Sequence, residues 1–211
     1  MPTLWGRETS INVQKVMWVL AENGQAYDRI DAGGRFGGLD AADYRAMNPS
    51  GRVPTLQDGA LTLWESNAIC RYLVDAYRGP LWCPEAADRA RADMWMEWFQ
   101  NGVYADFISL FYQTVRLAPD ARDPRILAEA LTALHSQFAI AEQALAGRDY
   151  LLGPEPTLAD VPFGACLYRY FTLDLDRPSH PQIQAYYARL CDRPAYRRAI
   201  MVDYSSLRAP A

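Results

Sequence analysis

The spacing of apolar residues divides the chain into two parts. In the first part, spacings typical of strands and of helices alternate, and in the second part the spacing is typical of helices alone. Up to residue 78, short apolar runs typical of strands alternate with apolar residues at the spacing typical of helices. The pattern predicts a strand at residues 3–5, a helix ending at Asn23-Gly24 and a second strand at residues 25–31. A flexible glycine-rich loop then precedes a short helix at residues 39–47.

A hairpin and a further helix complete the first part. Strands are predicted at residues 53–57 and 60–63, and Asp58-Gly59 between them favours a type I′ turn, which needs positive φ. A helix then begins at Ser66. The resulting order is β-α-β-α-β-β-α, in which the strands joined by a helix should pair in parallel and the hairpin should pair antiparallel.

The second part is predicted to be entirely helical. Residues 79–84 contain Gly and Pro and show neither the strand nor the helix spacing of apolar residues, so we interpret them as a linker. Thr157 and Asp160 resemble a capping box, with Asp in place of the usual Glu, at the start of one helix. Helices are expected at residues 86–117, 126–146, 157–171, 181–190 and 194–202. The sequence therefore predicts an α/β domain at residues 1–79 followed by an all-α domain at residues 86–211.

Composition and charge narrow the class of protein. The chain has 211 residues, half of them apolar, which suits a compact soluble protein of one large or two small domains. Its net charge of −4 gives no broad basic surface for nucleic acid. No apolar run approaches the roughly 18 residues of a membrane span. We therefore expect neither nucleic acid nor a membrane among its partners.

The N-terminus, the cysteines and the histidines bear on compartment and chemistry. Charged residues near the start leave no apolar signal core, and the four cysteines form no CxxC pair, so we expect reduced thiols in the cytoplasm. The only histidines, His135 and His180, lack metal-ligand spacing. Neither a metal site nor a His-based catalytic dyad is expected.

Pro54 is the first residue with candidate chemistry. It lies where a strand should begin, yet proline cannot donate to a sheet, so an edge or an irregular entry is expected. A cis Val53–Pro54 bond, a form that about 5–6% of X–Pro bonds adopt, would leave the backbone N–H and C=O of Val53 to pair with an extended peptide.

Glu65 and Ser66 begin the next helix. Helix starts expose unpaired N–H groups and a partial positive charge, which bind carboxylates. Ser66 can add a hydroxyl donor, and Glu65 can accept from an ammonium group. The alternative is ordinary N-capping, for which both residue types are suited.

Ser10 and Asn12 stand at the start of the first helix, where capping is again the alternative. A thiol with a pKa of about 8.5 is mostly protonated at neutral pH, although the thiolate is the nucleophile. Lowering that pKa by two units takes about 2.7 kcal/mol. One hydrogen bond to a charged group supplies roughly 1.5–3 kcal/mol, and a helix N-terminus supplies roughly 0.3–1 kcal/mol. A hydroxyl or amide donor together with the helix N-terminus is therefore sufficient to stabilise a bound thiolate.

Taken in order and with their spacing, these segments resemble a glutathione transferase. The resemblance spans nearly the whole chain, on residues 4–15, Gly51 to Pro54, Glu65 to Ile69, and Thr157 to Asp160. It implies a thioredoxin-like domain followed by an all-helical domain. It also implies glutathione as co-substrate, no metal, and a homodimer.

The resemblance implies roles for individual residues. Val53 would pair its backbone with the cysteinyl part of glutathione across a cis Pro54, Glu65 and Ser66 would hold the γ-glutamyl end, and Arg52 would lie near the glycyl carboxylate. Ser10 matches the hydroxyl of the serine-type classes, and Asn12 matches an asparagine of some bacterial and fungal relatives, so either would stabilise the thiolate. No Tyr ends the first strand and the first cysteine is Cys70, which disfavours the tyrosine-type and cysteine-type mechanisms.

The second substrate is expected between the domains, on residues of the long helix. Their spacing also fits ordinary core packing, which is the alternative for each. The expected residues are Tyr104, Phe107, Phe111, Tyr112 and Arg116.

We therefore expect a detoxifying transferase that joins glutathione to small electrophiles. A second hypothesis keeps the site but changes the reaction to that of a glutathione-dependent peroxidase, disulfide reductase or isomerase. A third hypothesis is a non-catalytic binding module with the same fold.

Overall fold

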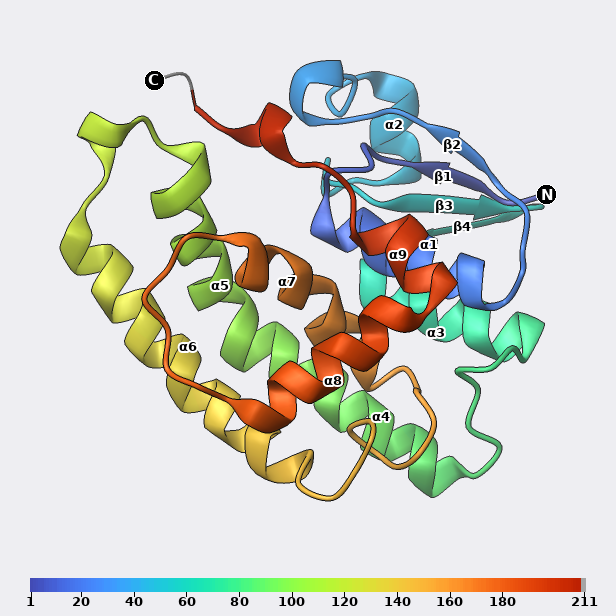
Figure 1. The fold of residues 1–211 in the computed structure, drawn as a ribbon. Helices are drawn as coiled ribbons and strands as arrows, with labels where there is room; N and C mark the ends of the chain where they lie inside the picture. The colour runs from blue at the N-terminus through green and yellow to red at the C-terminus, as the bar shows by residue number, and fades with distance from the viewer. Residues whose placement is uncertain (210–211) are drawn as a thin grey trace. The chain divides into compact units, whose positions relative to one another are not determined.

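The computed structural model describes residues 1–209, and its contacts divide these residues into two compact units (Figure 1). The first unit comprises Met1–Trp82 together with Arg193–Val202, and the second comprises Cys83–Asp192 together with the described residues after Val202. The predicted all-α domain includes residues 210–211, which lie outside the described residues. The domain boundaries proposed from the sequence stay a prediction.

The first unit contains a four-stranded sheet with the order β2-β1-β3-β4 (Figure 1). The first two strands are parallel, whereas β3 is antiparallel to both β1 and β4. Both pairing directions predicted from the sequence are thus confirmed. The strands are β1 (Thr3–Trp5), β2 (Asp28–Ile30), β3 (Thr55–Asp58) and β4 (Leu61–Trp64).

The helix α1 lies at the centre of the first unit, where it packs against α3 and α9. Trp18 of α1 is fully buried, and its ring meets the edge of Tyr196 at a centroid distance of 5.0 Å. The guanidinium of Arg193 binds both carboxylate oxygens of Glu22, at 2.9 and 2.8 Å. The helices of this unit are α1 (Ile11–Glu22), α2 (Ala42–Met47), α3 (Ser66–Tyr77) and α9 (Pro194–Ile200).

The hairpin has the predicted strands but not the predicted turn. Asp58 pairs with Leu61 as the last rung of the ladder, so the two turn residues are Gly59 and Ala60. Among the described residues of this turn only Gly59 has a positive φ, of 60°, which fits a type II′ turn rather than type I′. Asp58 stays in the strand because its carboxylate accepts hydrogen bonds from the hydroxyls of two tyrosines of α3, Tyr72 and Tyr77.

Two further expectations for the first unit need correction. The second strand is only three residues long instead of spanning residues 25–31, because its parallel register with β1 covers Asp28–Ile30 alone. The glycine-rich loop, expected to be flexible coil, contains a 3-10 turn at Gly34–Phe36.

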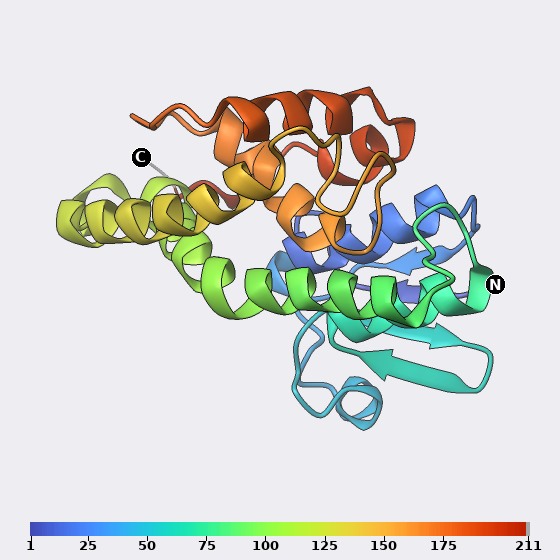
Figure 2. The ribbon, with the colours of Figure 1, turned by 90° about the horizontal axis from the view of Figure 1, so that it is seen from below.

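The described residues of the second unit form helices joined by loops, with no strand, as predicted. The expected long helix at residues 86–117 is interrupted by two π-helical segments, Phe99–Val103 and Tyr112–Arg116, yet its ribbon runs without a break from α4 into α5 (Figure 2). The helices are α4 (Ala86–Trp98), α5 (Tyr104–Phe111), α6 (Pro124–Ala144), α7 (Asp160–Thr172) and α8 (Pro181–Asp192), with a 3-10 turn at Pro119–Ala121.

Thr157 and Asp160 do form the predicted hydrogen bond with each other, although α7 begins at Asp160 with Ala159 at its N-cap position. The backbone N–H of Thr157 donates to Oδ2 of Asp160 at 2.8 Å, and Oγ1 of Thr157 accepts from the N–H of Ala159 at 3.2 Å. The fully buried Asp160 also accepts from the N–H of Leu151 and the hydroxyl of Tyr186, each at 3.0 Å. One carboxylate thereby joins the loop before α7 to the helix α8.

Within residues 1–209, every helix is too short or too polar to span a bilayer. The same residues contain no cluster of three or more His, Cys, Asp or Glu side chains placed to hold a metal ion.

Candidate functional site

Ser10 stands at the N-cap position of α1, but its side chain does not cap the helix. Its backbone is extended, with φ −87° and ψ 123°, and the hydroxyl makes no capping hydrogen bond. Its N–H donates to the C=O of Arg7, and its C=O accepts from the N–H of Gln14, so the backbone is fixed on both sides. The capping alternative considered for Ser10 is therefore not supported, and within residues 1–209 its hydroxyl has no hydrogen-bond partner.

The start of α3 has an unusual backbone at Glu65. This residue occupies the N-cap position with a φ of 71° and makes no side-chain capping bond. A positive φ is costly for a side chain with a Cβ, and such residues cluster at binding and catalytic sites. The strained turn leaves the Glu65 side chain exposed, directly before the buried Ser66.

Asn12 and Ser66 connect the two helix starts. The Ser66 hydroxyl donates to Oδ1 of Asn12 at 3.3 Å, across 54 residues of sequence. The residue expected to hold the γ-glutamyl end thus touches one of the two residues expected to stabilise the thiolate.

The electrostatics of both helix starts favour anions. Neither α1 nor α3 has an acidic residue in its first turn, although Glu65 occupies the N-cap position of α3. Each helix has 12 residues. The two N-termini, connected by the hydrogen bond between Ser66 and Asn12, suit the negative groups of a ligand, and the Glu65 carboxylate suits a positive group.

The loop before β3 carries Val53 and Pro54, and the peptide bond between them is cis, as the resemblance implied. Among residues 1–209, the N–H and C=O of Val53 make no hydrogen bond. A Cβ added to Gly6 would lie 2.4 Å from Cγ2 of Val13 and 3.2 Å from Cβ of Val53. The absence of a side chain at Gly6 therefore lets Val53 approach the first turns of α1.

Asn48 and Tyr44 hold this loop in place, and sequence reasoning assigned neither a role. Nδ2 of the buried Asn48 donates to the C=O of Arg52 at 2.8 Å and to Oγ1 of Thr55 at 3.0 Å. Its Oδ1 accepts from the N–H and the hydroxyl of Ser50. The hydroxyl of Tyr44 donates to the same Arg52 carbonyl at 2.7 Å. An Asn two residues before a Ser is a signal for an Asx turn, so part of this network was open to prediction.

Arg52 itself has its carbonyl fixed and its side chain exposed. This arrangement places the guanidinium at the surface beside Val53. It is consistent with the predicted contact to a carboxylate.

The buried side chain of Lys15 connects α1 to the start of α3. Lys15 is 1% exposed, and its Nζ donates to Oδ1 of Asn67 at 2.9 Å. Asn67 directly follows Ser66, so this bond holds the first turn of α3 against α1. Burial raises the pKa of the nearby Cys70 to about 12, although Lys15 lowers it in part. Cys70 is thus a protonated core thiol, in line with the disfavoured cysteine-type mechanism.

The five residues expected at a second-substrate site divide into two groups. Phe107 and Phe111 are buried, which favours their packing alternative; Phe111 lies under the guanidinium of Arg169 at 4.9 Å. Tyr104 and Arg116 are partly exposed and Tyr112 is 47% exposed. These three side chains are the ones accessible to a ligand.

Two family models match the chain. The N-terminal domain of glutathione S-transferase matches residues 2–75, and the C-terminal domain of glutathione S-transferase matches residues 104–194. Together they cover the sheet, α1 to α3 and most of the helical unit.

Similar proteins come from bacteria and plants. Glutathione S-transferase GstB of Escherichia coli (strain K12) is 36% identical over 208 residues, which are 97% of this chain and all of that protein. Glutathione S-transferase 3 of Zea mays is 29% identical over 93% of this chain and 92% of its own length. The crystal structure of the theta class glutathione S-transferase from Xanthomonas axonopodis pv. citri, solved with glutathione bound, superimposes with a TM-score of 0.93 at 46% identity and covers 96% of this chain and 98% of its own. On sequence, fold and domain order alike, the chain belongs to the glutathione S-transferase family of enzymes.

Proposed function

We propose that this protein conjugates glutathione to small electrophiles, with the thiolate held by Ser10 or Asn12. The observation that supports this most directly is the hydrogen bond from Ser66 to Asn12, because it joins the expected γ-glutamyl contact to the expected thiolate contact. The 46% identical Xanthomonas transferase was crystallised with glutathione, which supports the same ligand here.

Each part of the site has a role in holding the tripeptide. The N–H and C=O of Val53 pair with the cysteinyl backbone, as an added strand would. Ser66 and the N-terminus of α3 receive the γ-glutamyl carboxylate, and Glu65 accepts from its ammonium group. Arg52 attracts the glycyl carboxylate.

Ser10 and Asn12 are two candidate donors to the sulfur. The Ser10 hydroxyl has no partner among residues 1–209 and is therefore available to donate. Oδ1 of Asn12 accepts the hydrogen bond from the Ser66 hydroxyl, so the Nδ2 group of Asn12 points away from Ser66. Either donor, together with the helix N-terminus, supplies the roughly 2.7 kcal/mol needed to lower a thiol pKa by two units.

In the proposed reaction, the glutathione thiol first releases its proton to solvent. The thiolate then forms a C–S bond to the electrophilic carbon, while the leaving group, such as a halide, departs with its electron pair. Holding both reactants in place supplies much of the rate. Tyr104, Tyr112 and Arg116 are proposed to contact the electrophile. We further propose a role in detoxification, a cytoplasmic location and a homodimeric assembly, the commonest kind of soluble oligomer.

Alanine substitutions at Ser10 and Asn12 test the mechanism. We expect S10A or N12A to lower kcat about tenfold to a hundredfold with a halogenated nitroaromatic substrate, because a hydrogen bond to charge is lost. Glutathione binding, measured by calorimetry, should change less than threefold, a loss of well under 1 kcal/mol. The N-cap control is Asp123→Ala in α6, which removes a real capping bond outside the proposed site and should leave kcat unchanged.

Full conjugating activity in both single variants and the double variant would show that the proposed mechanism is wrong. Absence of glutathione binding to the unsubstituted protein would instead favour the non-catalytic hypothesis. Hydroperoxide, disulfide and cis-trans isomerisation substrates, assayed beside the halogenated one, separate conjugation from the other glutathione-dependent reactions.

A further inference from the structure

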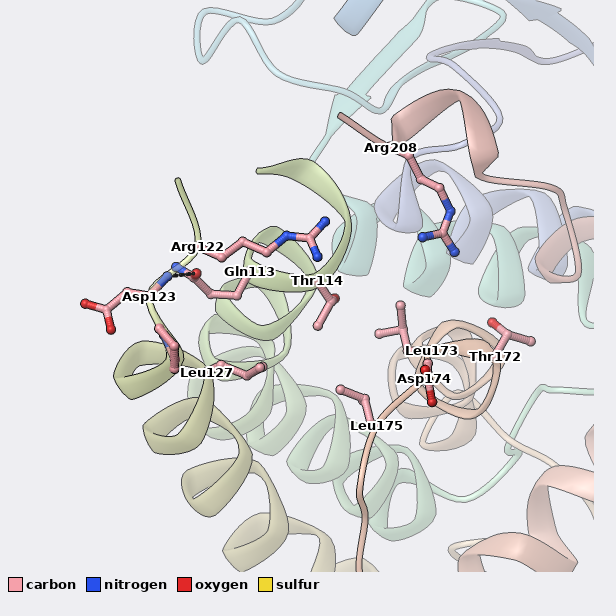
Figure 3. Close-up of a pocket in the computed structure, with 11 residues that line it drawn as sticks. Gln113, Thr114, Arg122, Asp123, Leu127, Thr172, Leu173, Asp174, Leu175 and Arg208 are labelled. Atoms are coloured by element: carbon pink, nitrogen blue, oxygen red, sulfur yellow. Dashed lines mark hydrogen bonds between the residues drawn. The ribbon is translucent and has the colours of Figure 1, made fainter. Parts of the chain in front are cut away.

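Lys15 is the only lysine in a chain that has 21 lysine and arginine residues. Side chains of both types usually keep their charged ends in solvent. Figure 3 shows two of the arginines, Arg122 and Arg208, which are exposed and extend into a cavity of the second unit. Lys15 is instead only 1% exposed. The chain thus places its single lysine where an ionisable side chain is costly to bury.

The Lys15 side chain lies beside the contact between Asn12 and Ser66. Its Nζ donates to Oδ1 of Asn67 at 2.9 Å, and Asn67 directly follows Ser66 at the start of α3. Asn12, which accepts from the Ser66 hydroxyl at 3.3 Å, precedes Lys15 by three residues in α1. Residues three apart on a helix are neighbours on its surface. Two neighbouring side chains of α1 therefore bind two successive residues of α3.

The charges around Lys15 come from the two helices that pack against α1. On α3, burial raises the pKa of the Cys70 thiol to about 12, and the charges of Lys15 and then Arg71 lower it in part. On α9, the neighbouring cation is Arg193, which binds the carboxylate of Glu22 two turns further along α1. The charge of Lys15 thus reaches a thiol on α3.

A bound glutathione thiolate would lie close to other negative groups. The tripeptide has two carboxylates and one ammonium group, and the proposed site adds the carboxylate of Glu65. Negative charges nearby raise the pKa of a thiol, whereas a nearby positive charge lowers it. The donor at Ser10 or Asn12 and the helix N-terminus must therefore act against these carboxylates, and a fixed ammonium group would offset them.

We propose that Lys15 is a positioning residue of the transferase reaction, whose ammonium charge favours the ionised form of the bound glutathione thiol. It holds Asn67, and with it the first turn of α3, next to Asn12. Lys15 transfers no proton: the thiol proton still goes to solvent, and the sulfur still forms the C–S bond. This inference rests on the proposed function and adds one residue to its site.

Substitution of Lys15 by methionine tests the role of the charge, because the two side chains are similar in length. The pKa of the bound thiol is measured from the ultraviolet absorbance of the thiolate. K15M should raise it by about one, since a close opposite charge shifts a pKa by roughly 1–3. At saturating glutathione, kcat/KM for the electrophile should fall about tenfold below this pKa and recover well above it.

Two further variants serve as controls for K15M. K15R keeps a positive charge and should retain the thiol pKa of the unsubstituted protein. R71Q removes a partly exposed positive charge from α3, outside the proposed site. It should shift the thiol pKa by less than about 0.3, because solvent screens exposed charges. Thermal unfolding verifies that each variant is folded.

A matched ligand separates the thiolate from the rest of the tripeptide. In γ-glutamyl-2-aminobutyryl-glycine a methyl group replaces the thiol of glutathione. Calorimetry at about pH 8 should show that K15M lowers the affinity for glutathione about tenfold more than the affinity for this analogue, because only glutathione can ionise at that position. Equal losses for the two ligands would mean that Lys15 only supports the fold or a carboxylate contact.

A measurement on the unsubstituted protein needs no variant to fold. Carbon-13 labelling of lysine gives one side-chain signal, since Lys15 is the only lysine. Its chemical shift should differ between the complexes with glutathione and with the methyl analogue, and identical shifts would contradict the proposal. So would a kcat/KM for K15M that is lowered by the same factor at every pH. Absence of a thiolate absorbance in the unsubstituted complex would instead count against the proposed function itself.

Discussion

At the scale of single residues, type alone left two interpretations of each helix start, and the structure distinguishes them. Ser10 and Glu65 both occupy N-cap positions, yet neither makes a side-chain capping bond. Asp123 and Thr157, by contrast, do accept from backbone N–H groups near the starts of α6 and α7. Neither Ser10 nor Glu65 is thus committed to capping, and the proposed ligand needs both side chains.

Substitutions of Glu65 separate the effect of its carboxylate on glutathione binding from the effect of its backbone conformation on stability. Both E65G and E65A remove the carboxylate, so each should weaken glutathione binding about tenfold by calorimetry. Only E65G relieves the positive φ of 71°. After allowance for the greater chain entropy of Gly, E65G should be up to about 1 kcal/mol more stable than E65A in urea unfolding. Equal stabilities of the two variants would contradict the proposed strain.

The network around Asn48 shows what residue types cannot reveal. The Asn–Pro–Ser–Gly order signals a turn, and the Asx turn to Ser50 follows from local chemistry. The bonds from Asn48 and Tyr44 to the Arg52 carbonyl depend on how α2 packs against the loop. No local pattern specifies that packing, so the support of Val53 was not predictable.

At the scale of elements, periodicity predicted where helices and strands lie better than how each one ends. The capping box before α7 was predictable because its two partners are three residues apart. The hairpin turn moved by one residue because α3, distant from the turn in sequence, holds Asp58 in its strand. The π-helical segments in the long helix gave no signal in the apolar pattern.

The buried cap of α7 gives the element-scale prediction. D160A should lower the free energy of unfolding by about 3 kcal/mol or more, because it leaves several buried donors without an acceptor. The control is D149A. Asp149 lies 3.6 Å from Arg189 in an exposed ion pair, so its loss should cost less than about 1 kcal/mol. Urea unfolding measures both values, and equal losses would show that the Asp160 network stabilises little.

At the scale of the whole molecule, the apolar pattern did not predict the contacts between segments that are distant in sequence. The strand order β2-β1-β3-β4 needs the antiparallel pairing of β1 with β3, which are separated by two helices. Likewise, α9 was correctly predicted as a helix, but its packing against α1 depends on partners 171 or more residues apart. Pairing within a hairpin or across one helix is local enough to predict, and these contacts are not.

The two histidines of the chain give the prediction at this scale, since folding brings them together. Their rings lie 5.9 Å apart, and Nε2 of His135 lies 3.1 Å from the hydroxyl of Tyr170. Burial lowers the pKa of His135, and the charges of His180 and Arg177 lower it further. The unfolded chain therefore binds a proton more readily than the folded protein, so the stabilising effect of a neutral His135 is full above pH 6.5 and is lost as the pH falls below it.

Comparison with H135Q isolates this effect. Between pH 7.5 and 5.5, the melting temperature of the unsubstituted protein should fall relative to that of H135Q, which cannot titrate at this position. Asp160, whose pKa burial raises to about 6, titrates in both proteins and cancels in the difference. A constant difference across this pH range would contradict the prediction.

The contacts of Trp18 with Tyr196 and of Glu22 with Arg193 have a consequence for folding during synthesis. Because α9 is encoded near the end of the chain, the sheet-containing unit emerges from the ribosome long before its last helix is synthesised. Until then, the indole of Trp18 lacks its native aromatic neighbour and Glu22 lacks its native cation. The nascent first unit therefore exposes the surface that α9 later covers while the helical unit is being synthesised. Folding of the first unit can be completed only when residues 193–202 have been made.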